Sequence, residues 1–114
     1  FFLSFSLTVM ADRIASFKEK VEKNPKQVFF RYSLAQAYFE EGEFVKASSE
    51  FRKCLDVRPD WMMASLFVGK AEVEIGNLQI ARQFLEMTVS LAEEQAHEDP
   101  MIEAKQLLEA LDAD

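Results

Sequence analysis

Residues 34–59 read LAQAYFEEGEFVKASSEFRKCLDVRP, and residues 68–93 read VGKAEVEIGNLQIARQFLEMTVSLAE. The two stretches carry similar side chains at positions 34 residues apart: Leu34 and Val68, Ala35 and Gly69, Gly42 and Gly76, Ala47 and Ala81, and Phe51 and Leu85. A proline precedes each unit, as Pro25 and Pro59. A fixed period in this range is typical of stacked repeats, in which each unit uses its neighbour's surface to complete its core. The repeat therefore favours a binding surface over reaction chemistry.

Apolar side chains recur at three- and four-residue steps through most of the chain, which indicates amphipathic helices. Gly and Pro number only three each in 114 residues, so few positions interrupt a helix. Asp12, Asp60 and the pair Asp99-Pro100 suit helix starts, and Gly42 suits the left-handed backbone after a helix. We therefore predict an all-α chain of antiparallel helices with short connections. The six expected helices cover residues 12–23, 25–41, 43–57, 61–75, 78–94 and 99–111.

These repeated positions resemble the tetratricopeptide repeat (TPR), whose usual signature is Trp-x2-Leu-Gly-x2-Tyr, then Ala-x3-Phe, then Pro. The first unit follows the signature closely but has Arg31 where Trp is common. The second is looser, with Ser65 and Glu72 at the aromatic positions and Glu93 where the closing proline would be. The resemblance implies that residues 10–114 form one domain, a short right-handed α-solenoid. In it, repeat 1 covers about 26–59, repeat 2 covers about 60–93, helix 12–23 precedes them and helix 99–111 caps the end.

The resemblance also assigns packing roles within and between the two repeats. Small residues allow two helices to approach closely, and large residues fill the space beside them. Gly42 and Gly76 are expected in the turns between helices. The expected packing residues are Leu34, Ala35, Tyr38, Gly42, Ala47, Phe51, Val68, Gly69, Gly76, Ala81 and Leu85.

In this family the first helix of each repeat lines a concave face. Carried over by register, that face has Phe29, Tyr32, Gln36, Phe39 and Glu40 from the first repeat, and Met63, Leu66, Phe67, Lys70, Val73 and Glu74 from the second. Most of this set is apolar, and a large exposed apolar patch usually marks a contact site. Alternatively, these residues pack under the N-terminal helix or the C-terminal cap. We expect Phe39 and Phe67 to stay accessible.

The composition argues against several other classes of function. The net charge is −7, and phosphate binding needs a basic footprint, so nucleic acid is not an expected partner. Cys54 is expected to be a packing residue, because a nucleophile needs a nearby base and the only histidine is His97. The acidic stretch around His97 matches no calcium or zinc spacing. We expect no cofactor, no metal site and no enzymatic activity.

Residues 1–9 read FFLSFSLTV and differ from everything after them, because they are apolar and uncharged. Nine residues are too few to span a bilayer as a helix. The segment is interpreted as a leftover of a tag or upstream reading frame before Met10, as a truncated secretory signal, or as a docking segment. A single cysteine fits a reducing compartment, so we expect a cytoplasmic location. A periplasmic or secreted location stays open if residues 1–9 are a signal remnant.

Two functions remain after these exclusions. The first is a non-catalytic adaptor, scaffold or assembly factor that binds an apolar peptide or amphipathic helix in the concave groove. Only Lys70 and Gln36 resemble the Lys, Asn and Arg side chains with which some relatives grip a C-terminal carboxylate, so that ligand is not favoured. The second is a self-associating structural protein that uses the same apolar face or the N-terminal segment.

Overall fold

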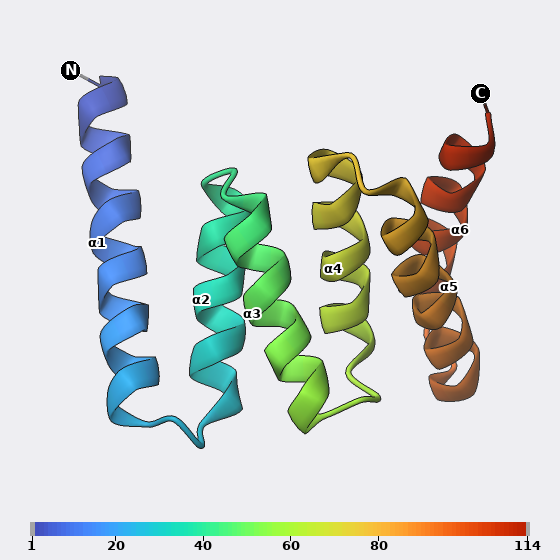
Figure 1. Ribbon diagram of the computed structural model, residues 1–114, viewed down its shortest axis with the longest axis horizontal. Coiled ribbons are helices and arrows are strands. Elements are labelled where there is room, and N and C mark those ends of the chain that lie inside the picture. The colour runs from blue at the N-terminus through green and yellow to red at the C-terminus, as the bar shows by residue number, and fades with distance from the viewer. Residues whose placement is uncertain (1, 114) are drawn as a thin grey trace.

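The computed structural model describes the backbone of residues 2–113 and the side chains from Thr8 to Ala113. The described part of the chain contains six helices and no strand, so the prediction of an all-α fold is confirmed. The helices are α1 (Phe2–Lys23), α2 (Val28–Glu40), α3 (Phe44–Val57), α4 (Met62–Ile75), α5 (Leu78–Gln95) and α6 (Glu98–Asp112). Successive helices run in opposite directions along the stack from α1 to α6 (Figure 1).

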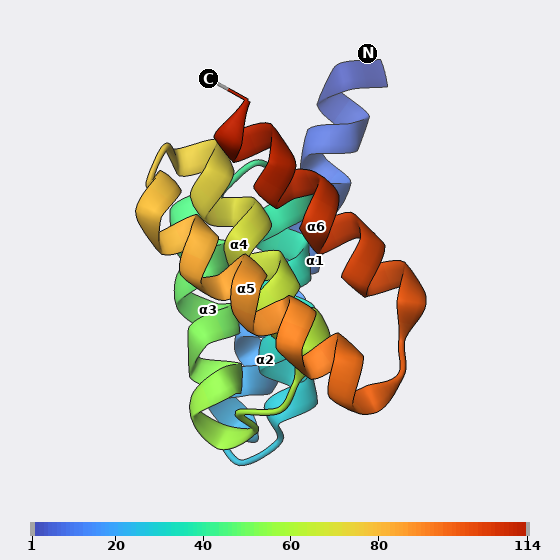
Figure 2. The same ribbon diagram turned by 90° about the vertical axis from the view of Figure 1, so that its right-hand side faces the viewer.

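Each helix packs mainly on the helices next to it in the sequence, and α4 also contacts α6. Viewed from the C-terminal end, α3 lies on one side of the stack, and α1 and α6 lie on the other (Figure 2). The helix α4 holds a central position in the stack, because it contacts α3, α5 and α6.

The sequence repeat reappears as the same turn at two places in the backbone. Gly42 and Gly76 both adopt the left-handed conformation, with φ of 85° and 97°. The next amide in each turn, of Glu43 or Asn77, donates a hydrogen bond to the carbonyl of Tyr38 or Glu72, at 2.8 and 3.0 Å. An L side chain is strained at such φ values, so glycine suits both positions.

The core consists of two clusters that meet at α4. The first combines buried residues of α2, α3 and α4, and Ile14, Phe17 and Val21 of α1 pack against it. The second combines Leu66, Leu85 and Ala104 with the leucines of α6. Nine expected packing residues are buried, and Gly42 and Gly76 lie in the exposed turns. The nine are Leu34, Ala35, Tyr38, Ala47, Phe51, Val68, Gly69, Ala81 and Leu85.

The first helix is longer than predicted, because it begins at Phe2 rather than at Asp12. Residues 2–11 contain neither Gly nor Pro, so nothing in them interrupts a helix. Asp12 consequently lies inside α1 and does not cap it. With 22 residues against 13 in α2, α1 is longer by ~13 Å at 1.5 Å per residue. Its N-terminal turns extend beyond the end of α2 (Figure 1).

Three other predicted helix starts also differ from the structure. Pro25 lies in the turn before α2, which begins at Val28. Trp61, and not Asp60, directly precedes α4, and no side chain caps that helix. Asp99 and Pro100 both lie within the first turn of α6, where the negative charge of Asp99 is favourable. Helix boundaries depend on tertiary packing as well as on capping side chains, so such shifts are expected.

We predict that Gly69→Ala destabilises the protein. A Cβ atom at Gly69 would lie 2.6 Å from Cδ2 and 2.8 Å from Cγ of Leu85, so the fully buried Leu85 side chain, or the two helices, would have to shift. Alanine normally favours a helix over glycine, but overpacking costs about 1–3 kcal/mol, and we expect the free energy of unfolding to fall by about that amount. Urea denaturation measures it.

The control for this prediction is the same substitution in a Leu85→Ala background. There the new methyl group has room, so the added cost of Gly69→Ala should disappear. If Gly69→Ala raised the free energy of unfolding of the otherwise unchanged protein, the close approach of α4 and α5 at this point would be wrong.

Candidate protein-interaction surface

Five aromatic side chains form a continuous row between α2 and α4, which we call the aromatic face: Phe29, Tyr32, Phe39, Trp61 and Phe67. Phe29 meets Trp61 edge-on at 5.4 Å between ring centroids, and Trp61 stacks on Tyr32 at 4.5 Å. Tyr32 then meets Phe67 at 6.3 Å, and Phe67 meets Phe39 at 5.3 Å. Edge-on and stacked geometries within this range of distances are favourable for aromatic pairs.

The helical repeat explains how the row forms. Phe29, Tyr32 and Phe39 lie three and seven residues apart on α2, so they share one side of that helix. Phe67 belongs to α4, and Trp61 directly precedes it. The Phe67 ring also stacks on the fully buried Phe51 at 4.9 Å, with an interplanar angle of 2°. The aromatic face is thus tied directly to the core, which fixes its rings in place.

Accessibility varies along the aromatic face. Phe29 is 60% exposed and is the most accessible of the five rings. Tyr32, Phe39, Trp61 and Phe67 are half-buried. Phe39 and Phe67 are therefore only partly accessible. The spacing pattern alone did not show that Phe29, at the start of α2, would be the more exposed ring.

A cation and an amide lie beside the aromatic face. The Lys70 ammonium lies 5.3 Å from the Phe67 ring centroid and 5.8 Å from that of Phe39. It also forms an ion pair with Glu103 of α6 at 2.8 Å. Gln36 is half-buried on α2. Lys70 therefore already has a carboxylate partner within the protein.

The predicted groove residues of α4 divide into two groups. Phe67 and Lys70 belong to or border the aromatic face, whereas Met63, Leu66 and Val73 lie in the second core cluster. Leu66 is 1% exposed, so its assignment to a partner-binding groove is wrong. The cause is α6, which contacts α4 and packs Leu107, Leu108 and Leu111 against this cluster. Met63, Leu66 and Val73 therefore pack under the C-terminal helix, which is the alternative that the sequence left open.

Two residues of this surface were not predicted from the sequence, namely Trp61 and Arg58. Trp61 was expected only as the first residue of a helix, whereas the structure puts its ring between Phe29 and Tyr32. The Arg58 guanidinium lies 5.1 Å from the Trp61 centroid and 5.8 Å from the Phe29 centroid. The available signal was Pro59, which forces a turn and brings the residues on both sides of it near the start of α2.

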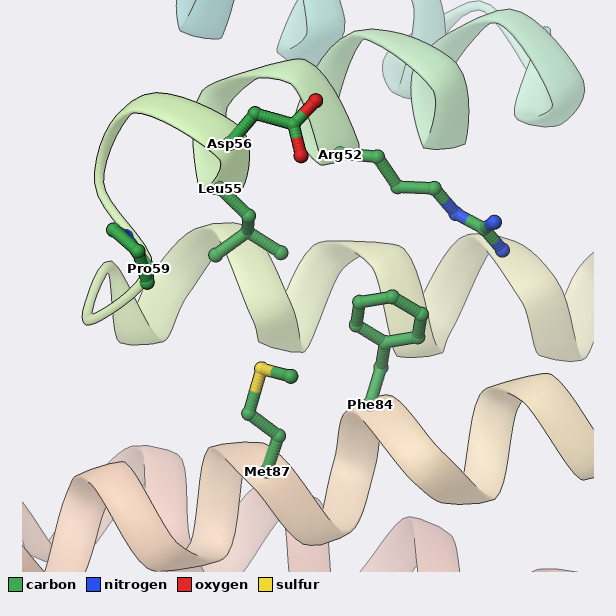
Figure 3. A pocket seen from close by; sticks show the side chains of 6 residues that line it. All are labelled: Arg52, Leu55, Asp56, Pro59, Phe84 and Met87. Carbon is green, nitrogen blue, oxygen red and sulfur yellow. The ribbon is translucent and has the colours of Figure 1, made fainter.

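A separate cleft of about 280 Å³ lies between α3 and α5, away from the predicted groove residues (Figure 3). Leu55 projects into it from α3, and Phe84 and Met87 project into it from α5, whereas Asp56 points away (Figure 3). Arg52, Pro59 and the stem of Asp56 complete its lining. Its walls are mainly apolar, with the Arg52 guanidinium 5.1 Å from the Phe84 ring centroid.

Burial changes the acid–base properties of two side chains, those of Cys54 and Tyr32. Cys54 is fully buried, and burial raises the pKa of its thiol to about 12, so the nucleophilic thiolate is disfavoured. Burial also raises the pKa of Tyr32. Within residues 8–113, no three His, Cys, Asp or Glu side chains gather closely enough to hold a metal ion. No helix in the described part of the chain is long and apolar enough to cross a membrane.

Comparison with solved structures identifies the architecture. PcrH in complex with the chaperone-binding region of PopD is similar at a TM-score of 0.85 and 18% identity, over 98% of this chain and 85% of that one. The first TPR of Spaghetti (RPAP3), bound to an HSP90 peptide, has a TM-score of 0.73 and 18% identity, over 91% and 83%. A tetratricopeptide repeat domain protein from Salinibacter ruber has a TM-score of 0.69 and 19% identity, over 78% and 90%.

The chain has the tetratricopeptide-repeat fold. The sequence matches no protein-family model and no curated protein sequence. Structural similarity at identities this low shows the fold alone, so the TPR architecture is established here through backbone geometry.

Repeat 2 replaces both aromatic residues of the TPR signature with buried polar groups. The Ser65 hydroxyl donates its one proton either to the Met62 carbonyl or to the Thr88 hydroxyl, each of which is 2.7 Å away. Thr88 in turn donates to the Phe84 carbonyl at 2.8 Å. Hydrogen bonding of this kind offsets the cost of burying the hydroxyl groups. A small polar pair therefore joins α4 to α5 where the signature would have a large ring.

The second replacement, Glu72, is only 4% exposed and connects three elements. Its carboxylate accepts hydrogen bonds from Ser48 at 2.7 Å and Arg52 at 2.9 Å, both on α3. It also accepts one from Asn77, just before α5, at 2.8 Å. A buried carboxylate needs such partners, and removing it would leave the partners without an acceptor.

We predict that Glu72→Ala lowers the free energy of unfolding by about 2–3 kcal/mol, because Ser48, Arg52 and Asn77 lose their shared acceptor. Glu74→Ala is the matched control, since Glu74 is exposed on the same helix, and it should change stability by no more than about 0.5 kcal/mol. Thermal and urea denaturation of both variants provide the comparison. Equal stability of the two variants would show that the Glu72 network contributes nothing.

Proposed function

We propose that this chain is a non-catalytic protein-interaction module that binds an apolar peptide or amphipathic helix along the aromatic face. The observation that supports this is the aromatic face itself, where five rings lie side by side and the outermost, Phe29, is 60% exposed. Aromatic side chains are enriched at protein interfaces and contribute many of the largest binding energies.

The anchoring of the rings favours binding. An aromatic side chain that is already packed loses little conformational freedom when a ligand covers it, so more of the contact energy appears as affinity. Phe67 is packed on Phe51, and Trp61 is packed on Tyr32. The half-buried rings then form the base of the binding surface. Phe29 provides an accessible edge on which an apolar side chain of the ligand packs.

Two structurally similar proteins support the class of ligand. The solved structure of PcrH contains the chaperone-binding region of PopD, and that of the Spaghetti (RPAP3) TPR contains the HSP90 peptide SRMEEVD. Both are complexes of a TPR-like fold with a peptide or protein segment. For the present chain we favour an apolar segment over a terminal carboxylate, because Lys70 is already paired with Glu103 and only Gln36 accompanies it.

We predict that Phe29→Asp weakens peptide binding about tenfold or more, because a charged residue would replace the exposed aromatic edge. The probe is the tightest binder selected from a displayed library of random short peptides against the unchanged protein. Its affinity is then measured by fluorescence polarisation for both proteins.

Val45→Asp is the matched control, because Val45 is also exposed, at 68%, but lies on α3 and contributes no ring to the aromatic face. It should leave the affinity unchanged. The proposal fails if Phe29→Asp, folded by circular dichroism, binds the peptide as tightly as Val45→Asp does. It also fails if the library yields no binder.

A second candidate function is self-association through the N-terminal part of α1. The observation in its favour is that α1 extends beyond the end of α2, and its first turns carry the uncharged sequence FLSFSLTV (Figure 1). Val9 in this segment is 49% exposed. Exposed apolar side chains on a helix are favourably covered by another copy of the same surface.

Light scattering on chains that begin at Phe1 and at Met10 tests this second candidate. We expect the longer chain to form a dimer or larger oligomer at high concentration and the shorter chain to stay monomeric, since only the longer one carries the apolar turns. Monomers in both cases would exclude self-association, and dimers in both cases would exclude this segment as its cause.

A further inference from the structure

Arg58 differs from every other arginine of the chain. Of the five arginines, the other four form ion pairs with carboxylates: Arg13 with Glu40, Arg31 with Glu50, Arg52 with Glu72, and Arg82 with Asp112. Arg58 forms no ion pair with any residue in the described part of the chain, although acidic residues outnumber basic ones by 20 to 13. An exposed, unpaired arginine in an acidic protein is therefore unusual here.

Its guanidinium is nevertheless held in place, because it lies over two rings of the aromatic face. The distances are 5.1 Å to the Trp61 centroid and 5.8 Å to the Phe29 centroid. Ring contacts of this kind stabilise a cation without using its N–H groups as donors. A guanidinium has five such donors in a planar fork that matches a carboxylate. Arg58 thus presents its donors at a position that the rings help to fix.

The position of Arg58 links it to the proposed binding surface. Trp61 stacks on Tyr32, so the rings that hold Arg58 continue into the rest of the aromatic face. The cation on Phe39 and Phe67 is Lys70, which is paired with Glu103. The aromatic face therefore has an unpaired cation beside Phe29 and a paired one beside Phe39.

The charges near Arg58 fit the contrast between this unpaired cation and the paired Lys70. Asp56 and Asp60 are close in sequence, but neither lies within ion-pair distance of Arg58, and Asp56 points up and away from the α3–α5 cleft (Figure 3). Residues 1–58 carry ten basic and eight acidic residues, for a net +2, whereas residues 59–114 carry three and twelve, for a net −9. An acidic ligand group is therefore attracted locally by Arg58, because no carboxylate in the described part of the chain forms an ion pair with it.

We propose that Arg58, with Phe29 and Trp61, forms an anchor for an Asp or Glu side chain of the bound peptide, while a neighbouring apolar side chain of that peptide packs on Phe29. This rests on the proposed function of the aromatic face and adds the chemistry and orientation of its ligand. The acidic residue lies at the Arg58 end, and the apolar anchors continue along the rings toward Phe39.

The test uses displayed libraries of random short peptides selected separately against the unchanged protein, Arg58→Gln and Arg82→Gln. Arg82→Gln is the control, since it removes the same charge on α5, away from the aromatic face. We expect peptides from the unchanged protein and from Arg82→Gln to combine apolar residues with an Asp or Glu at a fixed spacing. Peptides from Arg58→Gln should keep the apolar residues and lose the acidic preference.

A double-mutant cycle on one selected peptide makes the result quantitative. Replacing its acidic residue by the matching amide should weaken binding to the unchanged protein about tenfold, and should change binding to Arg58→Gln by less than about twofold. The affinity for the unchanged protein should also fall with added salt more steeply than that for Arg58→Gln.

The possible failures are distinguishable. If apolar peptides are selected but show no acidic preference, or show the same preference with Arg58→Gln, the Arg58 anchor is wrong and the proposed function stands. If the cycle gives the same tenfold loss with both proteins, the acidic residue binds elsewhere and the anchor is again wrong. If no peptides are enriched, or if Phe29→Asp leaves their affinity unchanged, the proposed function fails and the anchor fails with it.

Discussion

Close packing of helices at small side chains is the constraint on which this structure depends. Ala35, Ala47, Ala64 and Ala81 are fully buried, and Gly69 lies where even a methyl group would overlap Leu85. Such contacts let the helix axes approach, so that large residues such as Phe51 fill the remaining space from the side. The aromatic face follows from this packing, because Phe67 reaches Phe51 only when α3 and α4 lie close together.

The sequence predicted the architecture well because the relevant signals are local and repeated. Gly42 and Gly76 occupy equivalent left-handed turns, and the pairs Ala47–Ala81 and Phe51–Leu85 occupy equivalent buried positions. The start of α1 was predicted poorly, since Asp12 satisfies the pattern of a cap while the ten residues before it also favour a helix. A capping residue permits a helix to begin but does not require it to.

The candidate site was less predictable, because it depends on contacts between distant elements. Leu66 and Phe67 are neighbours on α4, yet one faces the leucines of α6 and the other faces the rings of α2 and α3. Spacing along α4 does not show which side α6 covers. The positions of Trp61 and Arg58 depend on the path of a short turn after α3, which no periodic pattern encodes. The polar partners of Glu72 likewise come from α3 and from the turn before α5.

The neighbour-by-neighbour packing of the helices also has a consequence for how the chain folds. Most contacts join elements that follow each other in sequence, and the contacts that skip a helix include those of α4 with α6 and, through aromatic rings, those of α2 with α4. Low contact order of this kind favours rapid folding, because little loop entropy is lost before stabilising contacts form. The two ends of such a stack do not have to pack on each other. Helix pairs can therefore be added or removed during evolution while the remaining interfaces keep their geometry.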